Sequence, residues 1–344
     1  MSKLLDRLAE GPVICAEGYL FEFERRGYLQ AGAFVPEVVL EEPGLVAQLH
    51  REFVHAGSDV VEAFTYYAHR EKLALIGREG DLETMNRQAL SIAKEVAAEH
   101  DSLFAGNICN TNVFDPDMVQ SHQIVREMFT EQVAWAAEAG VDMVIAETFS
   151  YASEAILALE VIKEAGLDAV ITVTIHRHAE TREGWSPAEA CKRIEDAGAD
   201  VVGLNCIRGP ATMLPLLADV RAACDGHLAA LPVPYRTTDA EPTFQSLTDP
   251  ATDLIPDGRP FPTALDPFTC NRYEMGAFAT AAHELGINYL GICCGAAPHH
   301  IRSVAEALGR TPPASRFTAD MSRHAFFGTD TRLKPVTQNY ASEL

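Results

Sequence analysis

Three of the eight cysteines stand where a metal site makes chemical sense. Cys293 and Cys294 are adjacent in Gly-Ile-Cys-Cys-Gly, and Cys206 closes the stretch Gly-Leu-Asn-Cys. Each stretch ends a short apolar run. Three thiolates with an open fourth position suit Zn²⁺ as a Lewis acid. Such a centre holds a fourth thiol as a reactive thiolate, because coordination removes its proton, and this favours thiol alkylation.

The alternative interpretations of these cysteines are structural. A closed structural zinc site usually has two Cys-x-x-Cys pairs, and the sequence has none. A single cysteine at a strand end is more often a small buried apolar residue. The adjacent pair together with Cys206 favours the metal. We expect the remaining cysteines to be structural: Cys15, Cys109, Cys191, Cys224 and Cys270.

A short phrase recurs along the chain and indicates the scaffold. In each copy, a Gly is followed by one further residue, then by Asp or Asn, and then by an apolar run. An amphipathic stretch precedes the Gly. The glycines concerned are Gly57, Gly140, Gly166, Gly198 and Gly286. This pattern is typical of a helix that ends on Gly, a tight turn and a buried strand. Its repetition indicates a wound parallel sheet.

The spacing of these units predicts a (β/α)8 TIM barrel. A doubly wound open sheet is the alternative, but no Gly-x-Gly-x-x-Gly follows the first strand. The predicted strands are 13–19, 60–67, 103–110, 143–150, 169–176, 201–206, 228–234 and 289–295. The predicted helices are near 43–57, 82–100, 119–139, 152–165, 186–197, 210–224, 271–285 and 298–308.

Two segments depart from the repeat. A Pro-rich stretch, 234–267, interrupts the seventh unit, and a loop of that length is usually a lid or a wall of the site. We expect residues 1–309 to form the barrel and 310–344 to form a C-terminal arm. The arm should pack on the barrel or on another subunit of a homo-oligomer.

The composition limits the kinds of molecule that this protein is expected to bind. The 344 residues carry a net charge of -22, so the chain should repel nucleic acid and anionic membrane surfaces. Neither a signal peptide nor an apolar run long enough to span a bilayer is visible. We therefore expect a cytoplasmic protein that acts on small molecules.

In such barrels the active site lies at the carboxyl ends of the strands. Gly-Leu-Asn-Cys, followed downstream by Gly-Ile-Cys-Cys-Gly-x-x-Pro-x-His-Ile, resembles the homocysteine S-methyltransferase family, and most of all its betaine-dependent branch. Segments 24–28, 49–53 and 64–68 are similar to that branch as well. The resemblance runs from about residue 10 to about residue 308. It implies a zinc-dependent (β/α)8 barrel.

The resemblance also implies roles for individual residues. Cys206, Cys293 and Cys294 match the zinc ligands. Glu147 matches the acid that binds the amino group of homocysteine, and a carboxylate at a strand end suits an ammonium. Tyr67 matches an aromatic residue of the donor pocket. A quaternary ammonium or sulfonium needs such aromatic faces because it has no N–H to donate.

Other positions depart from the family. The first strand usually ends in Asp-Gly-Gly or Asp-Gly-Ala, whereas here it ends in Ala16, Glu17 and Gly18. By strand alternation, Glu17 should point differently from the lost Asp; it either replaces that Asp or faces a cationic donor. Phe34 stands where the betaine enzyme has Trp, and Thr148 where a Tyr follows the acid. The donor elements have therefore changed most.

Two further sites are candidates. Asn205, beside Cys206, is expected to hydrogen-bond a bound carboxylate or to support the metal ligands. The run of His176, Arg177 and His178 either contacts a donor carboxylate or forms a solvated loop.

Together these features predict a zinc-dependent S-methyltransferase. It would move a methyl group from an onium donor, glycine betaine or similar, to homocysteine and so form methionine. Three alternatives remain open: a sulfonium donor such as S-methylmethionine or dimethylsulfoniopropionate, a different acceptor thiol, and a non-catalytic zinc or thiol sensor. The retained Glu147 argues against the sensor, which needs no anchor for an amino group.

Overall fold

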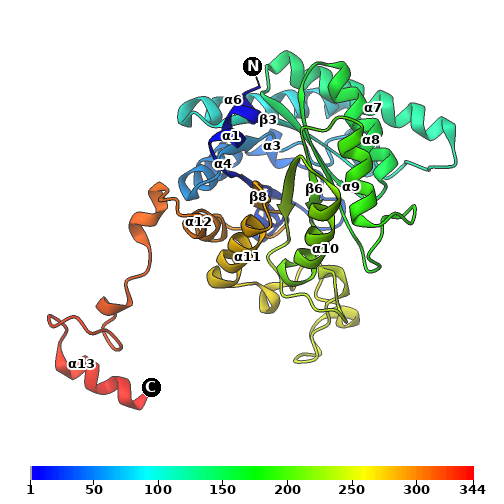
Figure 1. The fold of residues 1–344 in the computed structure, drawn as a ribbon. Helices are drawn as coiled ribbons and strands as arrows, with labels where there is room; N and C mark the ends of the chain where they lie inside the picture. The colour runs from blue at the N-terminus through cyan, green and yellow to red at the C-terminus, as the bar shows by residue number, and fades with distance from the viewer. Residues whose placement is uncertain (1) are drawn as a thin grey trace.

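Eight parallel strands close into a barrel in the computed structural model of the protein, which describes residues 2–344 (Figure 1). Neighbouring strands follow the chain order, and the last pairs with the first, Val13 opposite Tyr289. The predicted (β/α)8 barrel is therefore confirmed. The strands are β1 (Val13–Ala16), β2 (Val60–Glu62), β3 (Leu103–Cys109), β4 (Met143–Phe149), β5 (Asp168–Val173), β6 (Val201–Asn205), β7 (His227–Leu231) and β8 (Tyr289–Ile292).

All eight predicted helices are present, with nearly the predicted bounds. They are α4 (Pro43–Ala56), α6 (Leu82–His100), α7 (Val119–Ala139), α8 (Ala152–Glu164), α9 (Pro187–Asp196), α10 (Pro210–Ala223), α11 (Arg272–Glu284) and α12 (Pro298–Ala307). Five helices were not predicted: α1 (Lys3–Glu10), α2 (Tyr19–Arg25), α3 (Val38–Glu41), α5 (Arg70–Ala74) and α13 (Pro335–Tyr340). Among the residues described, no helix has the length and apolar character needed to cross a membrane.

The predicted strands ran too far at their carboxyl ends. β1 stops at Ala16, and Gly18 begins α2 as its N-cap. β2 stops at Glu62, although the Ala63 N–H still donates to the Ala105 carbonyl. The strands are buried on both faces, so apolar residues continue past the last sheet position and mask the strand end. The alternation argument for Glu17 was therefore wrong, because Glu17 lies outside the strand.

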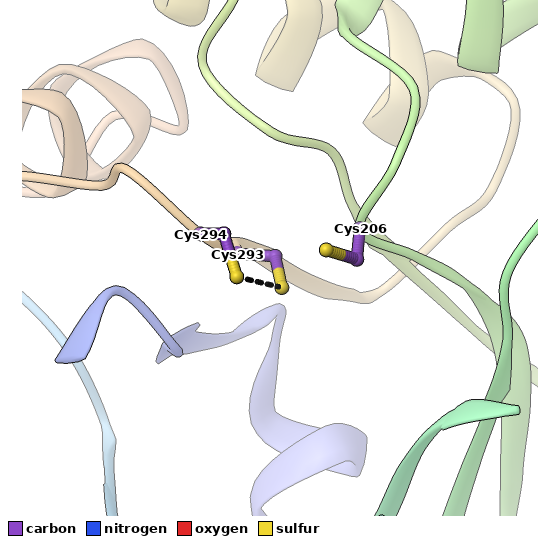
Figure 2. Close-up of side chains that lie close together, drawn as sticks. All are labelled: Cys206, Cys293 and Cys294. Atoms are coloured by element: carbon purple, nitrogen blue, oxygen red, sulfur yellow. Dashed lines mark hydrogen bonds between the residues drawn. The ribbon is translucent and has the colours of Figure 1, made fainter. Parts of the chain in front are cut away.

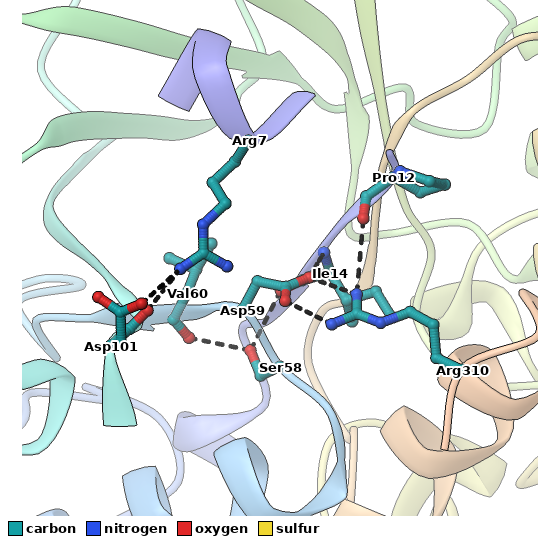
Figure 3. A network of polar contacts seen from close by, with 8 residues as sticks. All are labelled: Arg7, Pro12, Ile14, Ser58, Asp59, Val60, Asp101 and Arg310. Carbon is teal, nitrogen blue, oxygen red and sulfur yellow. Dashed lines mark hydrogen bonds and ion pairs between the residues drawn. The ribbon is translucent and has the colours of Figure 1, made fainter. Parts of the chain in front are cut away.

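The amino-terminal end of the barrel is closed by an ion pair (Figure 3). Arg310, just beyond α12, reaches both carboxylate oxygens of Asp59 at 2.5 Å. Asp59 Oδ2 also accepts the Ile14 N–H at 2.8 Å. This network joins the start of β2 to β1 and to the segment that follows α12.

The C-terminal segment first follows the barrel and then leaves it. Residues 313–317 form the short helix η5 (Pro313–Phe317), where Ser315 Oγ donates to Glu306 of α12 at 2.8 Å. Beyond η5 the chain extends away from the barrel and ends in α13 (Figure 1). Several large apolar side chains in this segment are exposed: Phe317, Met321, Phe327, Val336, Tyr340 and Leu344.

Candidate active site at the carboxyl ends of the strands

The three predicted metal ligands come together. Cys206 follows β6, Cys293 and Cys294 follow β8, and their sulfur atoms all lie within 4.8 Å of one another (Figure 2). The Sγ atoms of Cys293 and Cys294 are 3.9 Å apart. Tetrahedral Zn²⁺ with sulfur ligands requires sulfur–sulfur distances of roughly 3.8 Å. The cluster therefore fits Zn²⁺ in both donor type and spacing.

The anionic form of one sulfur of the cluster, that of Cys206, is favoured by its surroundings. Hydrogen bonds from the thiols of Cys293 and Cys294 hold the pKa of Cys206 well below the usual thiol range. Burial raises the pKa of Cys293, and the interaction with Cys206 raises that of Cys294. The three buried sulfurs therefore share a negative charge, as expected of a site that receives a cation.

The end of β7 sets the spacing of the sulfur ligands. Cys206 N–H donates to the carbonyl of Leu231 at 2.9 Å, and Cys293 N–H donates to the carbonyl of Pro232 at 3.0 Å. The intervening strand thus holds both cysteine-bearing chains in register. Gly295, with φ at +95°, completes the turn, since a Cβ there would lie 2.3 Å from the Tyr235 hydroxyl oxygen.

Three buried carboxyl groups line a small cavity next to the sulfurs. They belong to Glu17, Glu62 and Glu147. The side-chain nitrogen of Asn107 donates to Glu62 at 2.5 Å and to Glu147 at 2.8 Å. Oε1 of Glu17 and Oδ1 of Asn107 have no hydrogen-bond partner among the described residues. A cavity rich in acceptors and lacking a cation suits an ammonium group, which has three N–H donors.

Burial controls the charge of these acids. It raises the pKa of Glu17 and Glu62 well above the usual carboxyl range, and the neighbouring acids add to the effect. It raises the pKa of Glu147 to about 7, where hydrogen bonds from Asn107 and Thr148 oppose the shift. Glu147 is therefore the member of the cluster that ionises most readily near neutral pH.

Asn205 joins the carboxyl cluster to the sulfur cluster. Its side-chain nitrogen lies 2.8 Å from Glu147 Oε2, 3.4 Å from Glu17 Oε2 and 3.9 Å from Cys293 Sγ. Its Oδ1 accepts the Thr148 N–H at 3.0 Å. Asn205 therefore contacts side chains of both clusters.

Gly18 permits the close approach of two loops at the site. A Cβ at Gly18 would lie 2.5 Å from the Ala296 carbonyl oxygen. The turn that carries Glu17 therefore packs directly against the loop that follows Cys294. Any larger residue would push the acid away from the sulfurs.

A second cavity, of about 300 Å³, borders Cys206 and Cys294. The predicted donor residues Phe34, Tyr67 and Thr148 all line it. Its aromatic lining consists of Phe21, Phe34, Tyr66, Tyr67, Phe244 and Phe261. Phe244 and Phe261 belong to the Pro-rich segment, which therefore forms a wall of the site, as expected.

Tyr67 already contacts a cation from the protein. Lys72 Nζ lies 4.0 Å from the centre of the Tyr67 ring, and the Tyr66 ring centre is 4.3 Å away. The Tyr67 N–H donates to Cys109 Sγ at 3.3 Å, which ties the Tyr67 backbone to the end of β3. The two tyrosines thus form one aromatic corner of the larger cavity.

Left-handed backbone conformations are concentrated at this cavity. Eight non-glycine residues among those described have positive φ, and six of the eight line the cavity. These six are Phe34, Tyr67, Asn112, Thr148, Cys206 and Ile207. Such conformations cost about 1 kcal/mol or more each and are concentrated at binding sites in folded proteins.

Sequence reasoning missed several lining residues. Glu62 is the last residue of β2, but the predicted strand ran on to residue 67 and hid it. Asn107 lies within β3 and faces the carboxyl cluster. His176 lines the larger cavity, as does Arg182, whereas Arg177 is exposed and outside it. A strand end placed at Glu62 instead of at residue 67 would have identified this acid.

The chain is similar to known methyltransferases over most of its length. The sequence model for homocysteine S-methyltransferase matches residues 18–308. The chain is 36% identical over 338 residues to betaine–homocysteine S-methyltransferase 1 of Danio rerio, covering 95% of this chain and 80% of that protein. It is 33% identical over 345 residues to S-methylmethionine–homocysteine S-methyltransferase BHMT2 of Pongo abelii, covering 96% and 88%.

A solved structure supports the fold. The metallated form of the homocysteine methyltransferase MmuM from Escherichia coli superposes with a TM-score of 0.65 at 17% identity, covering 88% of this chain and 97% of that one. The matched sequence model and the two relatives indicate the same class of protein, the methyltransferases that act on homocysteine. This chain belongs to the homocysteine S-methyltransferase family.

Proposed function

We propose that the protein is a zinc-dependent enzyme that transfers a methyl group from an onium donor to homocysteine and so forms methionine. The observation that carries the proposal is the position of the sulfur cluster, which borders both the carboxyl cavity and the aromatic cavity. An amino-acid thiol and a methyl donor thus have separate places beside the same three sulfurs.

Cys206, Cys293 and Cys294 would hold Zn²⁺. When bound there, Zn²⁺ supplies a Lewis acid that favours the deprotonated form of an acceptor thiol. Glu147, with Glu17, binds the ammonium of homocysteine and fixes the direction of its thiol. The aromatic lining of the larger cavity binds the onium methyl groups by their positive charge.

The methyl transfer requires no general acid from the protein. The acceptor sulfur gives an electron pair to the methyl carbon as the bond from that carbon to the onium nitrogen or sulfur breaks. The electron pair of the broken bond stays on the leaving group, which departs as a neutral amine or thioether. The protein contributes position and exclusion of water, since the sulfurs and carboxyls are buried.

The test is methionine formation by the zinc-loaded protein, measured by mass spectrometry with homocysteine and a panel of onium donors. Cys294→Ala should lose stoichiometric zinc and turnover together. Cys224→Ala, which removes a buried thiol outside the cluster, should keep both. Absence of methionine with every donor, despite one bound zinc per chain, would refute the proposal.

The identity of the acceptor thiol can be tested in the same assay. Glu17 and Glu62 give the cavity more acidic groups than one ammonium needs, so other thiols should be compared with homocysteine at saturating donor. A non-catalytic zinc or thiol sensor is disfavoured by the carboxyl cavity. Unchanged activity in Glu147→Ala would argue for that sensor.

We also propose that the C-terminal arm contacts another subunit. Its exposed Phe327, Val336 and Tyr340 support this, because apolar side chains on an extended segment usually find a partner surface. Sedimentation of the full chain and of a chain ending at Phe317 tests it. Equal molecular masses per particle, after correction for chain length, would contradict the proposal.

A further inference from the structure

The two cavities that border the cysteines differ in their ionisable side chains. Among the described residues, the smaller one is lined by three carboxyl groups and by no basic side chain. The larger one is lined by no Asp or Glu among the described residues, yet it includes Arg182 and His176. In a chain with a net charge of -22, a guanidinium in a cavity lining that has no carboxylate suits an anionic ligand group.

Arg182 is held at the rim without an acidic partner. Among the described residues, its guanidinium makes no ion pair or hydrogen bond, and its nearest aromatic contact is the Tyr151 ring at 5.6 Å. The adjacent Glu183 is occupied elsewhere, since its carboxylate accepts the N–H groups of Ala152 and Ser153 at 2.9 and 2.8 Å. The guanidinium is therefore free to bind a carboxylate through two hydrogen bonds.

The backbone and His176 fix the position of this rim. The Arg182 N–H donates to the Ser150 carbonyl at 2.9 Å, and the Ser150 hydroxyl lies 2.9 Å from His176 Nε2. Burial, together with the nearby Arg182, lowers the pKa of His176. A guanidinium is protonated throughout the physiological pH range, so Arg182 supplies a permanent positive charge at this cavity.

We propose that Arg182 anchors the anionic end of the methyl donor, so that the donor is an onium carboxylate without an ammonium group. This inference rests on the proposed function of the same site. Glycine betaine and dimethylsulfoniopropionate share this chemistry. S-Methylmethionine carries an additional ammonium, which would meet Arg182 and no carboxylate in this cavity. Choline has the onium group and lacks the carboxylate.

Calorimetric titration of the zinc-loaded full chain measures donor binding directly, with methionine present to occupy the acceptor cavity. The ligands are glycine betaine, dimethylsulfoniopropionate, S-methylmethionine and choline. At least one of the two onium carboxylates should bind more tightly than S-methylmethionine and choline. Arg182→Gln should weaken that ligand about 10-fold, because a charge-assisted hydrogen bond is lost. Arg177→Gln is the matched control and should change nothing, since Arg177 lies outside the cavity.

Steady-state kinetics provide a second readout. Arg182→Gln should raise the KM of the preferred donor about 10-fold and leave the KM of homocysteine and the kcat at saturating donor within about 2-fold of the parent values. Arg182→Lys should restore part of the donor affinity, since it keeps the charge and loses the paired geometry. A merely structural role for Arg182 would alter both KM values or the melting temperature.

The outcomes separate the inference from the proposed function. If S-methylmethionine is the best donor, or if Arg182→Gln leaves donor affinity unchanged, the inference is overturned while the methyltransferase stands. If no donor yields methionine, the proposed function is refuted. Calorimetry then tests the Arg182 anchor on its own. Binding of an onium carboxylate that weakens in Arg182→Gln would then support the anchor, and absence of such binding would overturn it as well.

Discussion

The side-chain amide of Asn205 donates a hydrogen bond to Oε2 of Glu147 over 2.8 Å. Asn205 also precedes Cys206 in the chain, so the acid proposed to bind the substrate ammonium and a proposed metal ligand depend on one residue. A shift of Asn205 would move both. In the proposed complex, this contact would fix the position of the acceptor thiol relative to the metal.

We predict that Asn205→Ala weakens zinc binding by about 10-fold or more and lowers kcat/KM for homocysteine at least as much. The reason is that Glu147, Thr148 and the Cys206 chain lose a shared partner. Zinc affinity is measured by competition with a chromogenic chelator. Asn86→Ala is the matched control: this buried amide bonds to the Ala68 and Leu82 carbonyls, so its loss should lower the melting temperature only.

We predict that replacing two neighbouring acids of the carboxyl cluster has unequal effects on the KM of homocysteine. Glu147→Gln should raise the KM of homocysteine by about 10-fold or more, because a charge-assisted bond to the ammonium is lost. Glu62→Gln should change that KM by less than about 3-fold. Burial raises the Glu62 pKa well above the usual range, so this carboxyl is already neutral, and Gln keeps the oxygen that accepts from Asn107.

Glu147 and Glu62 also lead to a prediction for how the KM of homocysteine depends on pH. Glu147, with its pKa raised to about 7, is ionised above that pH, so the KM of homocysteine should fall as pH rises through about 7. That step should disappear in Glu147→Gln and persist in Glu62→Gln. An equal loss in both variants would mean that the ammonium lies between the two acids.

We predict that Glu154, which lies away from the proposed metal site, makes the folding stability depend on pH. Burial raises its pKa to about 7 against the hydrogen bonds that it accepts from the Thr111 backbone and hydroxyl. In the unfolded chain it ionises near pH 4, so folding is favoured by the neutral acid below that pH. This contribution, about 3 kcal/mol, is lost as pH rises from about 4 to about 7.

The test is the melting temperature of Glu154→Gln relative to the parent protein across this range. The variant cannot ionise, so the difference in melting temperature should move in its favour up to about pH 7 and then level off. A difference that stays constant with pH would show that Glu154 has an ordinary acidity.

The Asp59–Arg310 pair predicts a loss of stability without a loss of chemistry. Arg310→Gln should lower the free energy of unfolding by about 1 kcal/mol, and Asp59→Ala by about 2 kcal/mol, because the latter also leaves the Ile14 N–H unpaired. Zinc affinity should not change, since the pair closes the opposite end of the barrel. Arg332→Gln removes an exposed pair with Asp330 and should leave stability unchanged.

The barrel was predictable from the sequence because its units repeat. Helices that end on Gly, such as α4 and α7, lead into short strands buried on both faces, and this pattern can be recognised without any knowledge of contacts. The sulfur ligands were predictable for a related reason. Residues that follow the strands of one barrel gather around its carboxyl mouth, and Cys206 meets Cys293 and Cys294 there.

The polar part of the site was less predictable. Apolar residues continue past Glu62 into the mouth, so composition gave no sign of the strand end and the acid was overlooked. Arg182 lies in the chain between β5 and α9, and only the fold brings it to Ser150 beyond β4. Short helices such as α2 and α5 have too few turns for a periodic pattern to identify them.

The left-handed residues around the aromatic cavity have a consequence for the evolution of this barrel. Thr148 and Ile207 are β-branched, the side-chain type least compatible with such backbone angles, yet both have φ near +60°. Selection for heat resistance alone would replace them with Gly or Asn and relax the loops. Backbone strain at these positions is expected to hold the mouth in shape. Directed evolution toward a more heat-resistant catalyst should therefore leave these loops unchanged and draw its gains from the outer helices.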